Sequence, residues 1–161
     1  MRILFFYASK GNLFDKLYAL IHCSRLSRVE IEFSDGYRFG ISIYTGQLTF
    51  NTAYFRQCEW ISYTLPEHEK ALRHWCEKHR NVHIGRLAKW LICMRPLFIR
   101  AFGVKKIAEA LSHAGYNGVP TNRVTPDMLE RWVAKWLDDY SPLYYNCKQH
   151  LRRPKETLTW E

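Results

Sequence analysis

The sequence predicts a single α+β domain, in which a small antiparallel sheet packs against flanking helices. With 161 residues, of which 47% are hydrophobic and 16% aromatic, the chain can bury a core without disulfides. Residues 26–65 are dominated by strand-like alternation, whereas apolar residues recur at helical spacing after residue 65. Because strands and helices are largely segregated along the chain, the pattern favours α+β over alternating α/β.

A hairpin from Leu26 to Tyr44 is the clearest local signal. Apolar residues take every second position on both sides of Asp35-Gly36, a pair that suits the centre of a tight turn. One face of its first strand is apolar and consists of Val29, Ile31 and Phe33. The other face is charged, can lie over solvent or over a cleft, and consists of Arg28, Glu30 and Glu32.

Three further strands are expected at residues 2–7, 47–52 and 60–65, with sequential strands pairing antiparallel. The first of them, RILFFY, lacks polar alternation, which is typical of a strand buried on both faces.

Helical spacing predicts five helices, at residues 13–22, 65–79, 86–94, 104–111 and 126–137. Asn12 can cap the first, whose apolar stripe consists of Leu13, Leu17, Leu20 and Ile21. The second is expected to start from a capping box of Thr64 and Glu67 and to bury Ala71, Leu72, Trp75 and Cys76.

The remaining helices have their own boundary signals. Pro96 should stop the helix at 86–94, and Gly115 can end the next one as a left-handed cap. Thr125 and Pro126 fit the cap and first position of the last helix. Beyond residue 137 the pattern weakens, so we expect a domain at 1–137 followed by a basic extension at 138–161.

The basic residues are concentrated in one part of the chain. The formal net charge is +9, and no acidic residue occurs between Glu77 and Glu109. A basic face of this kind can attract nucleic acid, an acidic protein or an anionic lipid surface, although it can also serve solubility alone. The candidate partner-binding residues are Arg28, Arg86, Lys89, Arg95, Arg100, Lys105 and Lys106.

Cysteine usage and hydropathy indicate the compartment. Five scattered cysteines, an odd number, fit reduced thiols better than a disulfide framework. No apolar run approaches the roughly 20 residues of a membrane span, and the first residues do not form a signal peptide. We therefore expect a soluble, cytoplasmic protein without a membrane span.

An ordered set of short motifs resembles the permuted papain-like hydrolases of the NlpC/P60 type, in a branch often carried by bacteriophages. The set covers residues 1–137 and consists of SRVEIEFSDG, the turn before Leu48 and Phe50, Trp60, Leu65-Pro66, Trp75, AEALSHAG and TPDML. The resemblance implies a permuted papain-like fold, with a catalytic His at the start of the hairpin strand and a nucleophilic Cys at the N-terminus of a later helix.

Neither catalytic residue of that family is present where the resemblance places it. The His position falls on Arg28 and the Cys position on Gly103. Arginine stays protonated and cannot act as a general base, and glycine has no nucleophile. The resemblance therefore implies a pseudoenzyme that binds a protein or polyanionic partner, in the infected host cell or as part of a virion, with no cofactor.

Three alternatives stay open from the residues themselves. A displaced nucleophile, Cys147 or Cys23, would make the chain an active thiol hydrolase acting on an amide. Aromatic residues among the basic ones, as in RLAKWLICMRPLFIRAF, are typical of a nucleic-acid-binding module. Histidines near Cys23 and Cys76 invite a zinc site, but no second ligand pair completes it, so no metal is expected.

Overall fold

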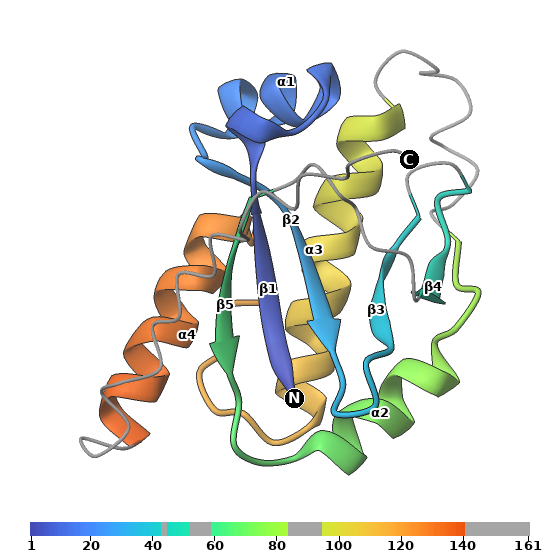
Figure 1. The fold of residues 1–161 in the computed structure, drawn as a ribbon, viewed down its shortest axis with the longest axis vertical. Helices are drawn as coiled ribbons and strands as arrows, with labels where there is room; N and C mark the ends of the chain where they lie inside the picture. The colour runs from blue at the N-terminus through green and yellow to red at the C-terminus, as the bar shows by residue number, and fades with distance from the viewer. Residues whose placement is uncertain (43–44, 52–58, 84–94, 141–161) are drawn as a thin grey trace, which may run out of the picture.

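In the computed structural model, which describes residues 1–42, 45–51, 59–83 and 95–140, five strands form one antiparallel sheet in the order β4-β3-β2-β1-β5 (Figure 1). The strands are β1 (Arg2–Tyr7), β2 (Leu26–Glu32), β3 (Arg38–Ile41), β4 (Leu48–Asn51) and β5 (Trp60–Thr64). The predicted α+β class and antiparallel pairing are confirmed. β5 does not follow β4 in the sheet, however, but pairs with β1 at the opposite edge.

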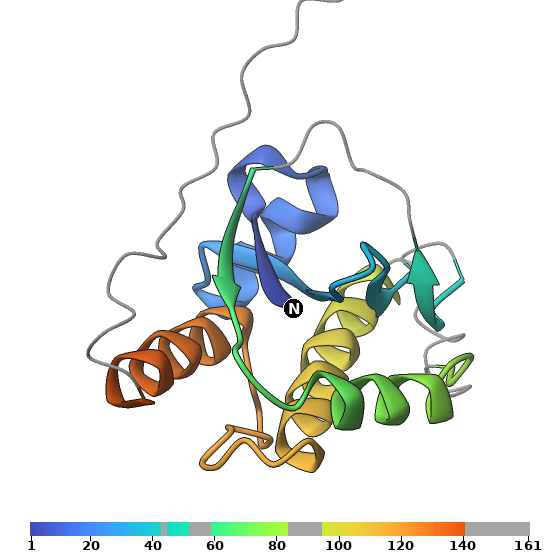
Figure 2. The same cartoon turned by 60° about the horizontal axis from the view of Figure 1, so that its bottom comes forward.

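The helices are α1 (Leu13–His22), α2 (Glu69–Lys78), α3 (Arg95–His113) and α4 (Pro126–Tyr140), with a short 3-10 turn η1 (Ala8–Lys10) before α1. Figure 2 shows α2, α3 and α4 on one side of the sheet, whereas α1 stands beyond the end where β1 leaves and β2 enters. The core lies between the sheet and the three helices, and its fully buried members include Ile3, Phe5, Ile31, Phe39, Ile107 and Leu111.

Several predicted boundaries are confirmed. The hairpin turns at Gly36 with a positive φ of 84°, and Gly115 ends α3 with a φ of 103°. The Tyr116 amide donates to the Leu111 carbonyl, which satisfies an end of α3 in the manner of a left-handed cap. Thr125 caps α4, because its hydroxyl accepts from the Met128 amide at 3.3 Å.

Two predicted helix boundaries are wrong. Thr64 belongs to β5, and α2 begins at Glu69 after His68, so the expected capping box of Thr64 and Glu67 is not formed. The helix predicted at 104–111 begins earlier, because α3 starts at Arg95 and has Pro96 in its first turn, where a missing amide hydrogen costs nothing. The helix expected at 86–94 falls outside the described residues.

Helix α1 turns its apolar stripe toward solvent and its polar face toward the rest of the protein. Asn12 caps it as predicted, and the stripe of Leu13, Leu17, Leu20 and Ile21 runs along one face, yet all four side chains are exposed. Leu13 and Leu20 are 76% and 75% exposed, whereas Tyr18 on the other face is 1% exposed. An amphipathic helix on a globular protein ordinarily buries its apolar stripe, so this orientation needs another cause.

The outward orientation of the leucine stripe predicts which substitutions in α1 lower the stability of the protein. Tyr18→Ala should lower the free energy of unfolding by about 3–5 kcal/mol, because it empties a buried aromatic site. The double substitution of Leu13→Gln with Leu20→Gln should change it by no more than about 0.5 kcal/mol, since exposed side chains contribute little. Chemical denaturation of the three proteins measures both values. A helix packed through its leucines would give the opposite ranking.

Candidate functional site

The polar face of α1 is tied to α3 by one buried arginine. Arg100, 1% exposed, donates from Nε to the Asp15 carboxylate at 2.9 Å and from Nη2 to the Asn12 side-chain oxygen at 3.1 Å. Asn12 and Asp15 also form the capping box of α1, each side chain accepting from the other's backbone amide at 3.0 Å. A single guanidinium therefore holds both capping residues of the helix.

Asp15 is kept ionised inside the protein. Burial by itself would raise the pKa of this carboxyl, but hydrogen bonds from Arg100 and Ser27 and the positive charges of Arg100 and Arg28 outweigh it and lower the pKa. Burial also raises the pKa of the neighbouring Tyr18 to about 12. At neutral pH the cluster around Asp15 thus consists of its carboxylate, the guanidinium groups of Arg100 from α3 and Arg28 from β2, and the neutral phenol of Tyr18.

Arg28 extends this cluster onto the sheet. Its Nε lies 3.9 Å from Asp15 Oδ1, its Nη1 lies 3.9 Å from Glu30 Oε1, and its guanidinium carbon lies 4.5 Å from the centre of the Phe6 ring. Burial raises the pKa of Glu30, although the charges of Arg28 and Arg38 oppose that rise. Gly40 leaves room for this carboxylate, since a Cβ there would stand 2.8 Å from Glu30 Cγ.

A second ion cluster lies further along the same strand. Arg38 on β3 donates from Nε to Glu32 at 3.1 Å, and Arg2 pairs with the same carboxylate from β1. Arg28 and Arg38 are each 7% exposed and Glu32 is 5% exposed. The charged face that was expected over solvent or over a cleft is therefore not exposed: Arg28 and Glu32 are buried and paired, and Glu30 is partly buried.

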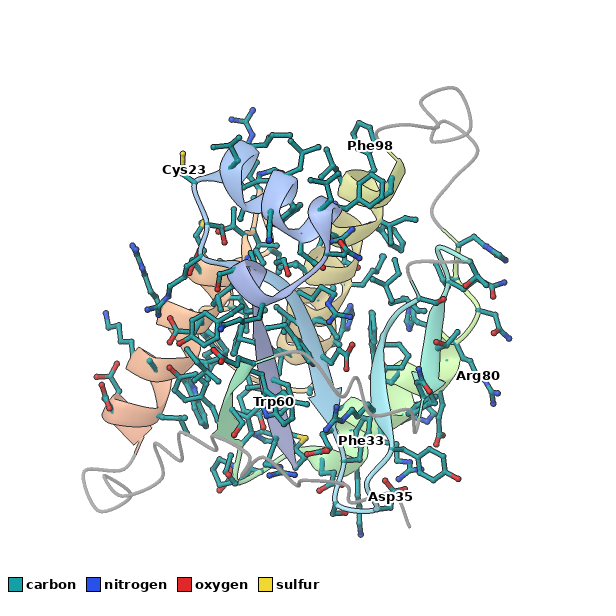
Figure 3. All side chains as sticks on the ribbon, turned by 45° about the horizontal axis from the view of Figure 1, so that its top comes forward. Cys23, Phe33, Asp35, Trp60, Arg80 and Phe98 are labelled. Carbon is teal, nitrogen blue, oxygen red and sulfur yellow. The ribbon has the colours of Figure 1, made fainter. Side chains whose placement is uncertain are left out.

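These contacts fix which way α1 faces. Since Asp15 and Tyr18 are held against the protein, the residues on the other side of the helix point outward (Figure 3). We call this set the α1 ridge; its members are Leu13, Phe14, Leu17, Leu20 and Ile21. Phe98, 45% exposed, lies beside the N-terminal end of α1, where Arg100 joins α3 to Asn12 (Figure 3).

The two positions that the resemblance assigns to catalysis lie in unlike surroundings. Arg28 is buried among ion pairs, and Gly103 lies in the middle of α3, not at a helix N-terminus. A Cβ at Gly103 would stand 2.5 Å from Ile41 Cγ2, so the helix and β3 approach too closely there for a side chain. The glycine is explained by packing, because a cysteine at this position would require the Ile41 side chain to move.

The described cysteines are not placed as nucleophiles. Cys76 is fully buried in the core, and burial raises the pKa of its thiol. Cys23 is exposed and ends α1 in a left-handed conformation, whereas activated thiols commonly sit at helix N-termini. Cys147, the other displaced candidate, lies outside the described residues.

The predicted partner-binding residues divide into three groups. Arg28 and Arg100 are buried in ion pairs, so the prediction that they belong to a binding surface is corrected. Lys105 is 57% exposed on α3, and Lys106 beside it is half-buried, with both near the Glu109 carboxylate. Arg95 is the first residue of α3, and Arg86 and Lys89 fall outside the described residues.

The residues considered for zinc do not converge. Cys76 points into the core, and His79 stacks on Trp75 with ring centres 3.8 Å apart. Across residues 1–42, 45–51, 59–83 and 95–140, no three His, Cys, Asp or Glu side chains gather closely enough to hold a metal ion. Among the helices in the same ranges, none has the length and apolar character needed to traverse a membrane.

Comparison of the chain with known protein families, curated proteins and solved structures found no match. The fold itself, in the part of the chain that the structure describes, belongs to the α+β class and has a five-stranded antiparallel sheet.

Asp15 is the residue that sequence reasoning missed. Asp15, Tyr18 and His22 recur at helical spacing opposite the leucine stripe, which marks a second face with its own contacts. Nothing in the sequence pairs Asp15 with Arg100, because the two are 85 positions apart.

The buried ion pair gives a prediction for stability and its pH dependence. Asp15→Asn should lower the free energy of unfolding by about 3–5 kcal/mol at pH 7, since Arg100 would stay buried without a counter-charge. In the wild type, the contribution of a carboxyl with a lowered pKa is present above its unfolded pKa of about 3.9 and is lost as the pH falls further. Denaturant titrations between pH 2 and 7 measure both effects.

A paired replacement supplies the control. Asp15→Leu combined with Arg100→Met should be far less destabilising than Asp15→Asn, because no unpaired charge is left inside. Equal losses for the two proteins would contradict a role for charge pairing.

Because Gly103 lies so close to Ile41, replacing this helical glycine by alanine should lower the stability of the protein instead of raising it. Gly103→Ala should destabilise the protein by about 1–3 kcal/mol, because the new methyl would collide with Ile41. In a helix interior with free space, the same change stabilises by about 1 kcal/mol. Thermal or chemical unfolding measures the sign. A double-mutant cycle with Ile41→Ala, which removes the Cγ2 methyl, tests the contact, since Gly103→Ala should cost less in the Ile41→Ala background than in the wild type.

Proposed function

We propose that the chain is a non-catalytic, permuted papain-like protein of bacteriophage type that binds an acidic protein or a nucleic acid through basic residues. Such a protein would work inside the infected host cell or as a component of the virion. The proposal rests on the resemblance in sequence together with the surroundings of the two positions where that resemblance expects catalysis.

The single observation that supports loss of hydrolysis is the close packing at Gly103. A thiol there would need space that Ile41 Cγ2, 2.5 Å from the expected Cβ, already occupies. At the His position, the Arg28 guanidinium is 3.9 Å from Asp15 and is part of a buried ion cluster. Regaining the chemistry would therefore require repacking of α3 and β3 as well as two substitutions.

Binding through basic residues is supported by positive charge that is not used in buried ion pairs. The net charge is +9, and Lys105 keeps its ammonium group in solvent at 57% exposure, 4.0 Å from the nearest Glu109 oxygen. An exposed pair of this kind contributes little to stability, so the lysine is available to a stronger anionic partner. Lys106 lies 5.6 Å from the centre of the Phe102 ring, which places an aromatic side chain among the cations.

The binding proposal is tested by charge reversal. Replacing Lys105 and Lys106 by Glu should weaken binding of a single-stranded oligonucleotide or of polyglutamate by about tenfold or more, because two contacts to the polyanion would become repulsive. For the oligonucleotide, the slope of log K against log salt should also fall by about two. Fluorescence anisotropy at several salt concentrations measures both quantities.

A matched control distinguishes the effect of a local basic surface from the effect of the net charge of the protein. Lys70→Glu with Lys135→Glu reverses two exposed lysines on α2 and α4 and alters the net charge equally. Equal losses in the two double variants would contradict a defined basic site. Preference for polyglutamate or for the oligonucleotide decides which partner class is bound.

The non-catalytic part of the proposal has its own test. The purified chain should not hydrolyse peptide, amide or ester substrates, and none of its thiols should react rapidly with an alkylating agent near pH 7. Turnover that is abolished by Cys147→Ser or Cys23→Ser would overturn the proposal in favour of a thiol hydrolase.

A further inference from the structure

The α1 ridge is a continuous apolar surface without a covering element among the residues that the structure describes. Its five side chains are between 36% and 76% exposed. At 3.6 residues per turn they fall within an arc of about 120° along a helix about 15 Å long. Phe98 adds a sixth exposed apolar side chain at the N-terminal end of this helix (Figure 3).

The ridge cannot be buried by turning the helix. A rotation that covered Leu13 and Leu20 would bring Asp15 into solvent and leave Arg100 buried without its carboxylate. Loss of one partner of a buried ion pair costs a free energy comparable with the gain from burying two leucines, so the rotation would bring no net stabilisation. The ion cluster therefore presents the apolar face outward, convex and at one end of the molecule (Figure 1).

Charge decides which occupant fits a convex apolar ridge. The acidic residue of α1, Asp15, is buried and paired, whereas Lys16 is exposed at the border of the ridge. Lys10, also exposed, lies just before the helix and has Glu59 at 3.6 Å. With a net charge of +9, the chain as a whole is attracted to anionic surfaces.

We propose that the α1 ridge inserts into the interfacial region of an anionic lipid bilayer and docks the protein there. Apolar side chains of an interfacial helix enter the boundary between headgroups and acyl chains, while flanking lysines stay at the level of the anionic headgroups. This surface lies on α1, apart from Lys105 and Lys106, so the inference goes beyond the proposed function and stands independently of it.

Two other occupants fit the charges less well. A second copy packed ridge to ridge would bring two Lys16 side chains and two chains of net charge +9 together. Nucleic acid is bound through cations and stacking rings, whereas four of the five ridge residues are aliphatic.

The test is binding of the full chain to vesicles of phosphatidylcholine with 30% phosphatidylglycerol. Leu13→Gln with Leu20→Gln should lower the partition coefficient at least about tenfold, because two leucines no longer leave water. The matched control is Tyr37→Gln with Met128→Gln, which removes two exposed apolar side chains elsewhere and should leave binding unchanged. Lys16→Gln should weaken binding roughly fivefold and lower its salt dependence.

The results of these binding measurements distinguish a lipid bilayer from the other possible occupants of the α1 ridge. Loss of binding in the ridge variant alone, with weaker binding to pure phosphatidylcholine, supports the proposal. No binding by the wild type, equal losses in both double variants, or equal binding to charged and uncharged vesicles overturns it. A wild-type dimer in analytical ultracentrifugation that the ridge variant dissociates would also overturn it, because the ridge would then be an interface between copies. The unfolding measurements on the same ridge variant show whether it is folded.

Discussion

The structure depends on the contact between Arg100 and the capping box of α1. A guanidinium that is 1% exposed has almost no water to donate to, so it depends on oxygens of the protein as acceptors. Asp15, Asn12 and the Pro96 carbonyl supply those oxygens within 3.1 Å. Because the acceptors belong to α1 and to the first turn of α3, this one side chain sets the distance and rotation between the two helices.

The same physical constraint continues across the sheet. Arg28 and Glu30, and then Glu32 and Arg38, form largely buried pairs on the face of β2 that points away from the apolar core, and the partly exposed Arg2 joins the second pair. Buried pairs of this kind are weak evidence for high stability, because desolvation offsets much of their attraction. Their effect on the register of the sheet is clearer, since a slip of one residue in the pairing of β2 would turn Arg28, Glu30 and Glu32 toward the core.

The fold therefore separates two surfaces of different chemistry. The exposed lysine on α3 offers positive charge for a polyanion, whereas the α1 ridge offers apolar area beside a few cations. Arg100 and Asp15, which join α1 to α3, are buried and paired, so neither proposed binding surface would have to rearrange. A preformed surface binds without the entropic cost of ordering loops. It can therefore reach a useful affinity even when the contact area with the partner is modest.

The sequence by itself determined the elements whose signals are local. The hairpin around Asp35-Gly36, the caps at Asn12 and Thr125 and the end of α3 at Gly115 each depend on neighbours a few residues away, and all were predicted correctly. Only the tertiary structure decided what lies further apart: that β5 pairs with β1, that Gly103 is a packing position against Ile41, and that α1 turns its leucines outward. The outward orientation of α1 cannot be predicted from its apolar stripe alone. Arg100, 85 positions away from Asp15, holds the polar face of the helix against the protein, and this buried ion pair offsets the gain from burying the leucines.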